Sequence, residues 1–286
     1  MTQCTTAIAI LLATYNGETY LASQLDSLLS QSYGNWHLYV HDDGSTDATP
    51  TILHRYAVMY PRQVTLLDYP AQGGAYANFM SLLQRVEAPY YMFCDQDDVW
   101  HREKIALTMA AMKQAEHGGQ WRPVVVHTDL RVVDGNGLQL APSFWQQAGI
   151  RPNLFHTFAQ RISNVVTGCT MLFNQPARAA ALRRRPACCP LHDEWVTIRC
   201  CAEGGTVVPL FQQTIDYRQH TGNTLGAEAC YQQKTAAYYL TNIRRIWCQN
   251  RDNYRVLRSA GYGSPLTYLL NKLRLILVYH FNIRCL

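Results

Sequence analysis

Three carboxylates stand within four residues of the chain: Asp95, Asp97 and Asp98. The preceding residues, 90–94, are apolar or aromatic throughout, as expected of a buried strand. Acids this close repel one another unless a cation lies between them, and Mg²⁺ or Mn²⁺ takes such oxygen ligands together with substrate phosphates. A solvated acidic turn that caps the next helix would use the same residues, so this spacing alone leaves both interpretations open.

A second acidic turn, Asp42-Asp43-Gly44-Ser45, follows a strand-like segment at residues 36–40. One of its carboxylates could accept a hydrogen bond from a nucleobase or a ribose hydroxyl, and an Asx-type turn leading into a helix is the alternative. Tyr15 follows the apolar run 7–13, and its ring could stack on the same base or pack in the core.

The elements that must position these residues alternate between strand and helix. The continuous apolar run at 7–13 predicts a strand buried on both faces, and further strands are expected at 36–40, 64–67 and 90–94. Helices are expected at about 21–29, 47–60, 75–85 and 103–115. This order predicts an α/β fold with a Rossmann-like, mainly parallel central sheet flanked by helices. Because ligands bind outside the carboxyl ends of parallel strands, the acidic turns and Tyr15 should meet at one edge.

The second half of the chain is less regular. Strands are expected at 124–127, 165–173 and 207–210, helices at 177–185 and 193–202, and a hairpin turn at 134–137. Residues 229–286 read as helical and hold nine Lys/Arg against one acid, a formal charge of +8 that leaves −3 for residues 1–228. We therefore expect a catalytic domain at 1–228, with a nucleotide-sugar half at about 1–115 and an acceptor half at about 116–228, followed by a basic helical extension at 229–286.

Composition excludes several classes of protein. The 286 residues are 48% hydrophobic, too apolar for a disordered chain. The longest apolar runs are shorter than a bilayer span, and the first residues lack the basic region and cleavage site of a secretory signal. The ten cysteines contain no C-x-x-C, so neither a zinc nor a redox motif is present, and we expect reduced, mostly buried thiols in a cytoplasmic protein.

Three further functions are disfavoured by missing patterns. A nicotinamide-dependent oxidoreductase would carry G-x-G-x-x-G after the first strand. A nucleotidyltransferase would place basic residues in the loop after that strand, and residues 13–18 contain none. Nucleic-acid binding is not expected, because the body is net negative and the basic extension lacks interleaved aromatic side chains for base readout.

Taken together, the motifs resemble the inverting family 2 glycosyltransferases with the GT-A fold. The resemblance covers residues 5–228 and rests on ATYNGETYLASQLDSLLSQSYGNWHLYVHDDGSTD, GGAYANF, YYMFCDQDDVWHREKI, GCTMLFN, HDEW and YRQHTGN. The DQDDVW segment is similar to that of the rhamnosyltransferase-like subgroup, which builds bacterial O-antigens and capsules. Several motifs in this order are far more specific than one Asp-x-Asp.

The resemblance implies a nucleotide-sugar site. Ala13, Tyr15 and Asp43 match positions that hold the base, with Tyr15 stacking on it and Asp43 hydrogen-bonding to it. Asp95 and Asp97 match the Asp-x-Asp that binds the ribose and the metal ion on the diphosphate.

Two more residues complete the predicted donor site. Asp98 is an additional acid at the sugar end. His220 is a candidate metal or phosphate contact, although a structural role is the alternative and Arg218 could carry the phosphate charge instead.

On the acceptor side, Asp193 matches the carboxylate that deprotonates the acceptor hydroxyl. The sequence departs from many relatives in having His192 before it, and Glu194 is a second acid close by. Gly168 suits a close backbone approach near the acceptor, or simply a turn. Trp195 could form a platform for a sugar ring or pack in the core.

The expected function is therefore metal-dependent transfer of a sugar, rhamnose or a similar hexose, from a dTDP- or UDP-sugar to a saccharide acceptor linked to a polyprenyl diphosphate. Mg²⁺ or Mn²⁺ is the expected cofactor. A non-catalytic carbohydrate-binding or assembly module and a sugar-nucleotide nucleotidyltransferase are the alternatives.

The extension suggests a location. The leucines around Lys272 and Arg274 resemble an amphipathic basic helix that lies on an anionic membrane, and a helix docked on the catalytic domain is the alternative. A peripheral position on the inner face of the plasma membrane would suit a lipid-linked acceptor.

Overall fold

The computed structural model describes residues 8–117, 121–152, 162, 164–188, 191–220 and 241–281, with side chains up to residue 275. The strands are β1 (Ile8–Thr14), β2 (Trp36–Asp42), β3 (Val64–Leu66), β4 (Tyr90–Cys94), β5 (Val99–Trp100), β6 (Val124–Asp134), β7 (Gln139–Ala141), β8 (Met171–Asn174) and β9 (Thr206–Gln219). The helices are α1 (Leu21–Leu29), α2 (Thr49–Met59), α3 (Ala75–Arg85), α4 (Lys104–Ala115), α5 (Phe144–Gln147), α7 (Gln175–Leu182), α8 (His192–Ala202), α11 (Ile243–Ser259) and α12 (Pro265–Phe281), and a 3₁₀ turn covers Gly168–Thr170.

These strands form one sheet in the order β3-β2-β1-β4-β8-β6-β9-β5, with β7 beside β6. The β3-β2-β1-β4 half is parallel, as predicted. In the other half β8 runs antiparallel to both β4 and β6, while β6 and β9 are parallel. The expectation of a mainly parallel sheet therefore holds for the first half, and the second half is mixed.

Helices cover both faces of the sheet, which explains why β1 is apolar from Ile8 to Ala13. Ile8, Ile10 and Leu12 pack with α1, α2 and α4, whereas Ala9 and Leu11 pack on the opposite face with α3, α7 and α8. Successive side chains of a strand point to opposite faces, so a strand covered on both sides is continuously hydrophobic.

The hairpin expected at residues 134–137 is present and joins β6 to β7. Asp134 exchanges backbone hydrogen bonds with the residues that follow it, and Gly137 takes a left-handed φ of 87° that suits glycine. Two predicted strands are longer than expected, β6 by seven residues and β9 by ten. The segment expected as one strand at 165–173 is instead a 3₁₀ turn followed by β8.

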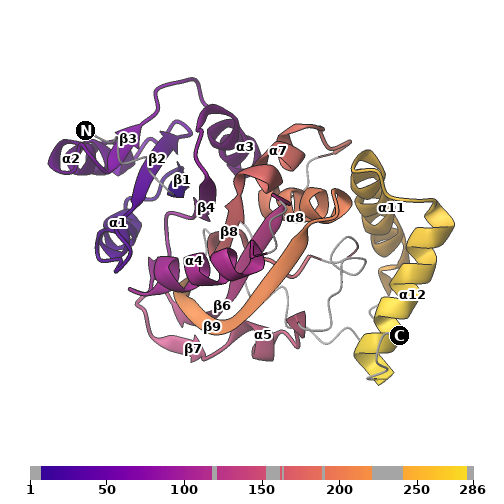
Figure 1. Ribbon diagram of the computed structural model, residues 1–286. Helices are drawn as coiled ribbons and strands as arrows, with labels where there is room; N and C mark the ends of the chain where they lie inside the picture. Colours follow the sequence, from indigo (N-terminus) through magenta and orange to yellow (C-terminus); the bar gives the residue numbers. More distant parts are fainter. Residues whose placement is uncertain are drawn as a thin grey trace.

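The extension forms two helices, α11 and α12, at the end of the molecule opposite α1 and α2 (Figure 1). Val256 and Leu257 of α11 join the core on the α3–α7–α8 side, as does Tyr268 of α12. Arg199 of α8 donates a hydrogen bond to the carbonyl of Ala260 at 2.9 Å. The two helices are therefore docked on the α/β part of the chain, while residues 229–240 and 282–286 of the predicted extension lie outside the described residues.

Two further expectations can be compared with the structure. All cysteines among the described residues are free thiols, four of them buried, as predicted. Within the same residues, no helix combines the length and hydrophobicity needed to cross a bilayer.

Candidate active site

The carboxyl ends of three adjacent strands bring the predicted nucleotide residues to one edge. β1 lies between β2 and β4, so Tyr15, Asp43 and Asp95 each follow one of three neighbours. The backbone N–H of Asp43 donates to Thr14 O at 2.9 Å, which ties the ends of β1 and β2 together. The topology thus gathers residues that are up to 80 positions apart in the sequence, as expected from the alternation of strands and helices.

A residue that we did not single out connects this edge to the acidic loop. The side chain of Gln96 accepts from the backbone N–H of Tyr15 at 2.8 Å and donates to its carbonyl at 2.9 Å. Gly17 lies so close that a Cβ there would be 2.4 Å from Oε1 of Gln96. The paired bonds leave the Tyr15 ring exposed, with 57% of its surface accessible, as a stacking platform would be.

Asp43 makes hydrogen bonds within the chain to the loop at residues 72–74. Its carboxylate accepts hydrogen bonds from the backbone N–H groups of Gln72, Gly73 and Gly74, the last at 2.7 Å. Gly73 and Gly74 have positive φ angles of 80° and 131°, which lets three successive amides converge on one side chain. In this conformation Asp43 holds the loop beside the nucleotide edge, and its contact with a base stays a prediction.

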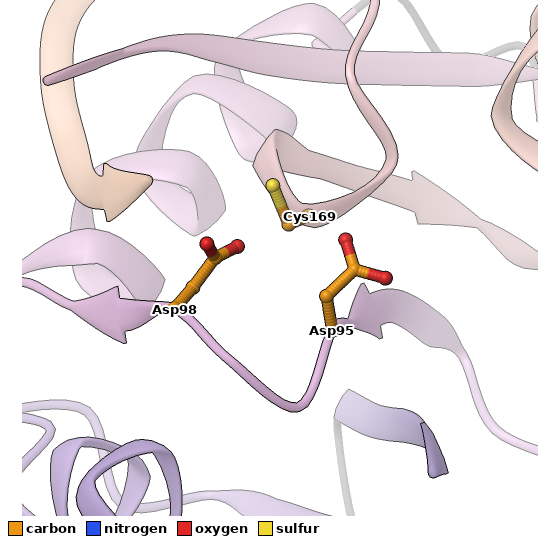
Figure 2. Close-up of side chains that lie close together, drawn as sticks. All are labelled: Asp95, Asp98 and Cys169. Atoms are coloured by element: carbon orange, nitrogen blue, oxygen red, sulfur yellow. The ribbon is translucent and has the colours of Figure 1, made fainter. Parts of the chain in front are cut away.

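The acids after β4 form a buried cluster. Figure 2 shows Asp95 and Asp98 facing each other across the end of the strand, with Cys169 beside them, and ligand atoms of the three lie within 4.8 Å of one another. Asp98 is fully buried, and its Oδ2 has no hydrogen-bond partner. Burial, followed by the charges of Asp97 and Asp193, raises the pKa of Asp95 to about 7. Burial and the neighbouring acids hold the pKa of Asp98 well above its usual range.

Asp97 and His220, the two predicted metal ligands, lie next to each other. Nε2 of His220 is 2.8 Å from Oδ2 of Asp97, although 123 residues separate them. His220 comes directly after β9, and its ring packs against Tyr20 at 4.8 Å between centroids. The length of β9 is what carries His220 to the acidic loop.

This group of side chains fits a divalent cation. The carboxylates of Asp95 and Asp98 face each other, and a buried oxygen of Asp98 lacks a partner. The imidazole of His220 stands beside Asp97 in the same loop. Mutual repulsion of this kind is relieved by a hard cation with oxygen ligands. Cys169 is a softer donor on the buried side of the same cluster.

Asp193, the predicted base, lies against the acid cluster from the first turn of α8. Its charge acts on Asp95, and its side chain is buried, with 6% of the residue exposed. Burial, followed by the charge of Glu194, raises its pKa to about 7. Gly168 lies alongside: a Cβ there would come within 2.6 Å of His192 Nε2 and 3.5 Å of Asp193 Cβ. Gly168 therefore packs closely against the first turn of α8, and its approach to an acceptor stays a prediction.

The neighbours of Asp193 face other directions. The ring of His192 stacks on Phe79 at 4.0 Å and meets Phe93 edge-on. Glu194 is partly buried, and the positive charge of Lys272 in α12 acts on its carboxylate.

Of the two roles considered for Trp195, a sugar platform and core packing, the structure shows core packing. Trp195 is fully buried, and its indole N–H donates to Ala181 O at 2.9 Å. Residues two apart on a helix point about 200° apart, so a helix that aims Asp193 at the acid cluster aims Trp195 into the core.

Sequence reasoning also missed two buried groups behind the cluster. Cys169 was counted only as a core thiol, although it directly follows Gly168 in the GCTMLFN motif. Lys104 is fully buried, its Nζ lies 4.3 Å from the centre of the Trp100 ring, and burial lowers its pKa to about 8. Its charge acts on Asp98 from the interior. A lysine in the first turn of an ordinary amphipathic helix carries no signal that distinguishes it from a surface lysine.

Comparison with known proteins identifies the family to which this chain belongs. The family model for Glycosyl transferase family 2 matches residues 9–179, which is more than half of the chain. The chain belongs to glycosyltransferase family 2.

Over 98 residues it is 37% identical to the dTDP-rhamnosyl transferase RfbG of Shigella flexneri, covering 33% of this chain and 34% of that protein. An uncharacterized glycosyltransferase of Rickettsia prowazekii, RP339, is 25% identical over 165 residues, 58% of this chain and 49% of its own length. The matches thus span about a third to a half of these relatives.

Solved structures show the same fold. S. aureus TarS, in complex with UDP-GlcNAc, superimposes with a TM-score of 0.55 at 18% identity, over 85% of this family 2 chain and 66% of TarS. The mannosyltransferase PcManGT of Pyrobaculum calidifontis, solved with GDP-Man and Mn²⁺, superimposes with a TM-score of 0.55 at 15% identity. The match covers 96% of this chain and 81% of PcManGT. The predicted GT-A fold is confirmed.

Proposed function

We propose that this chain is a metal-dependent inverting glycosyltransferase that moves a sugar from a nucleoside-diphosphate sugar to a saccharide acceptor. The observation that carries the proposal is the position of Asp193. Its carboxylate is buried, and its Cβ would be 3.5 Å from a Cβ at Gly168, the residue directly before Cys169 of the acid cluster. A base must stand beside the donor, because the acceptor oxygen attacks the anomeric carbon while it loses its proton.

In the proposed reaction, the acceptor hydroxyl attacks one face of the anomeric carbon and the diphosphate leaves from the other face. The acceptor hydroxyl gives its proton to the Asp193 carboxylate as its oxygen bonds to the anomeric carbon. The bond from that carbon to the diphosphate breaks on the opposite face, and the leaving diphosphate takes the electron pair, so the configuration inverts. The raised pKa of Asp193 makes it a better proton acceptor than an exposed carboxylate.

Asp97 and His220, which lie 2.8 Å apart, would hold a divalent cation. Asp95 and Asp98, which face each other in the acid cluster, would supply further carboxylate oxygens. When bound, the ion supplies Lewis acidity that neutralises the leaving diphosphate. Without it, the diphosphate would meet only the negative charges of the acid cluster. The Mn²⁺ found in the mannosyltransferase PcManGT supports this part of the proposal.

The chemical classes of the donor and the acceptor are proposed from the similarity to known glycosyltransferases. The similarity to a dTDP-rhamnosyl transferase favours a dTDP-linked deoxyhexose, with UDP-sugars as the next choice. We propose a growing glycan on a polyprenyl diphosphate as the acceptor, in the synthesis of a bacterial surface polysaccharide. The reaction would then take place at the cytoplasmic face of the plasma membrane.

The test is turnover of a panel of dTDP- and UDP-sugars by the purified protein with Mg²⁺ or Mn²⁺, followed as release of nucleoside diphosphate. We expect turnover that EDTA abolishes and that Asp97→Ala reduces at least about a hundredfold. Full activity of Asp97→Ala would contradict the metal site. Donor binding without turnover would support a carbohydrate-binding module, and conversion of a nucleoside triphosphate and a sugar 1-phosphate would support a nucleotidyltransferase.

A further inference from the structure

Helix α12 has apolar side chains on two opposite faces. Tyr268 and Leu275 face the catalytic domain and pack with its core. Four leucines on the other face follow the i, i+3, i+4, i+7 spacing of one helical stripe, and between 50% and 65% of each is exposed: Leu266, Leu269, Leu270 and Leu273. A helix that only docked on its own domain would carry polar side chains on this outer face. Hereafter these four residues are called the leucine stripe.

Helix α11 adds aromatic and basic side chains next to α12. Tyr268 Oη lies 2.9 Å from Asn250 Oδ1, so the two helices are adjacent. Ile243 and Trp247, one turn apart on α11, are 64% and 63% exposed, and the Arg251 guanidinium lies 5.5 Å from the Trp247 ring. Four arginines recur along one face of this helix: Arg244, Arg251, Arg255 and Arg258.

Helices α11 and α12 carry a large excess of positive charge. Residues 241–275 contain seven Lys/Arg against a single acid, Asp252. Exposed leucine and tryptophan combined with a dense positive charge are typical of a helix that lies in the interface of an anionic membrane. A second copy of this chain would bring the same positive charge against itself, so charge complementarity favours the lipid surface.

The helix pair also adjoins the proposed acceptor side. Tyr268 of α12 packs in the same core cluster as Trp195 of α8, and Arg199 of α8 donates a hydrogen bond to Ala260 O after α11 at 2.9 Å. The positive charge of Lys272 also acts on Glu194. Glu194 in turn is the residue after Asp193, and its charge acts on that carboxylate. A surface that binds α12 would therefore lie close to the point where the acceptor hydroxyl must enter.

We infer that α11 and α12 form a docking surface for an anionic bilayer, with the leucine stripe inserted among the acyl chains and the arginines on the headgroups. Resting on the proposed function, this contact would present a membrane-linked acceptor to Asp193. The lipid contact itself needs no transferase activity, so the two proposals can fail separately.

The experiment is co-sedimentation of the full chain with vesicles of equal parts phosphatidylglycerol and phosphatidylcholine, compared with phosphatidylcholine alone. We expect binding to the anionic vesicles only, weakened by high salt as the charges are screened. Replacing the leucine stripe with glutamine (Leu266→Gln, Leu269→Gln, Leu270→Gln and Leu273→Gln together) should lower vesicle affinity at least about tenfold. Arg251→Gln/Arg255→Gln/Arg258→Gln should do the same.

The control is Leu138→Gln/Leu140→Gln, which removes two leucines that are 68% and 57% exposed on the β6–β7 hairpin. This variant should bind vesicles like the unaltered chain. Thermal unfolding and donor binding confirm that each variant is folded.

Three results would overturn the inference: no binding to anionic vesicles, equal loss in the control, or a dimer in the absence of lipid that the leucine-stripe variant converts to a monomer. The last result would assign the surface to self-association. Vesicle binding by a protein that turns over no sugar nucleotide would contradict the proposed function and leave the membrane surface intact.

Discussion

At the scale of single residues, the environment decides which of several acids can act as a base. Asp193 and Glu194 are adjacent, yet only Asp193 interacts with the donor-side acid Asp95, while Glu194 interacts with Lys272 of α12. Exchanging each for its amide separates their roles, because the amide keeps the shape and removes the charge.

We predict that Asp193→Asn lowers kcat by about 10²–10⁴-fold, the range for loss of a general base. Binding of the donor, measured by calorimetry, should change little. Glu194→Gln is the matched control and should retain most of the activity. Greater loss in Glu194→Gln than in Asp193→Asn would assign the base to the other acid.

The pH profile of kcat/KM provides a second prediction for Asp193. Its pKa of about 7 means that the carboxyl is protonated at lower pH and cannot accept the acceptor's proton. Activity should therefore fall about tenfold per pH unit below 7. Because the charge of Glu194 helps to raise this pKa, Glu194→Gln should move the profile to lower pH. A flat profile between pH 5 and 8 would be inconsistent with this base.

The metal-free acid cluster should make stability depend on pH. The folded-state pKa of Asp95, about 7, exceeds its ordinary value of 3.8, so the folded chain binds more protons than the unfolded chain between these values. The free energy of unfolding should then fall as pH rises through this window, by at least about 1 kcal/mol. Urea unfolding in EDTA should show this fall, and Asp95→Asn should reduce it. Added Mg²⁺ should restore stability at high pH, since it binds the ionised folded state.

At the scale of elements, single buried side chains decide how strands and helices join. Asn174 ends β8 and begins α7; its Oδ1 accepts from the backbone N–H groups of Ala177 and Val124, and its Nδ2 donates to Arg122 O and Glu116. One amide thus caps a helix and closes the end of the sheet.

We predict that Asn174→Ala lowers the free energy of unfolding by about 2–4 kcal/mol, because it removes the cap and leaves buried backbone groups unpaired. Asn242→Ala is the control: Asn242 holds the equivalent position before α11 but makes no capping bond with its side chain, so the change should stay within about 0.5 kcal/mol. Chemical denaturation measures both. Equal effects would mean that the buried bonds of Asn174 contribute nothing beyond an ordinary helix start.

At the scale of the whole molecule, the extension is integrated with the catalytic domain through Arg199. This side chain is 2% exposed and donates to Ala180 O in α7, to Ala260 O after α11, and to Glu203 at 2.6 Å. Three segments thus share one buried guanidinium.

We predict that Arg199→Met lowers the free energy of unfolding by about 3 kcal/mol or more, because two carbonyls and a carboxylate lose their partner. Arg183→Met is a matched control, since Arg183 bonds to the same Glu203 but is 61% exposed. Its effect should be below about 1 kcal/mol. Denaturation curves that do not separate the two variants would show that the extension is held by its apolar contacts alone.

Local patterns in the sequence determined most of the elements and the edge at which they gather their acids. Hydrophobic runs located β1 and β4 to within a residue, because a strand buried on both faces is hydrophobic along nearly its whole length. The strand-like segment at 36–40 located β2 to within two residues, although β2 contains His37. The order of strands and helices then placed Tyr15, Asp43 and Asp95 at one sheet edge, since parallel strands all end on the same side.

Only the tertiary structure decided which direction each side chain faces and what it contacts. The antiparallel entry of β8, the amides that engage Asp43, the burial of Trp195 and the place of Cys169 in the acid cluster all depend on contacts between segments far apart in sequence. Hydrophobic periodicity reports how deeply a residue is buried, whereas its partners are set by packing that brings distant segments together.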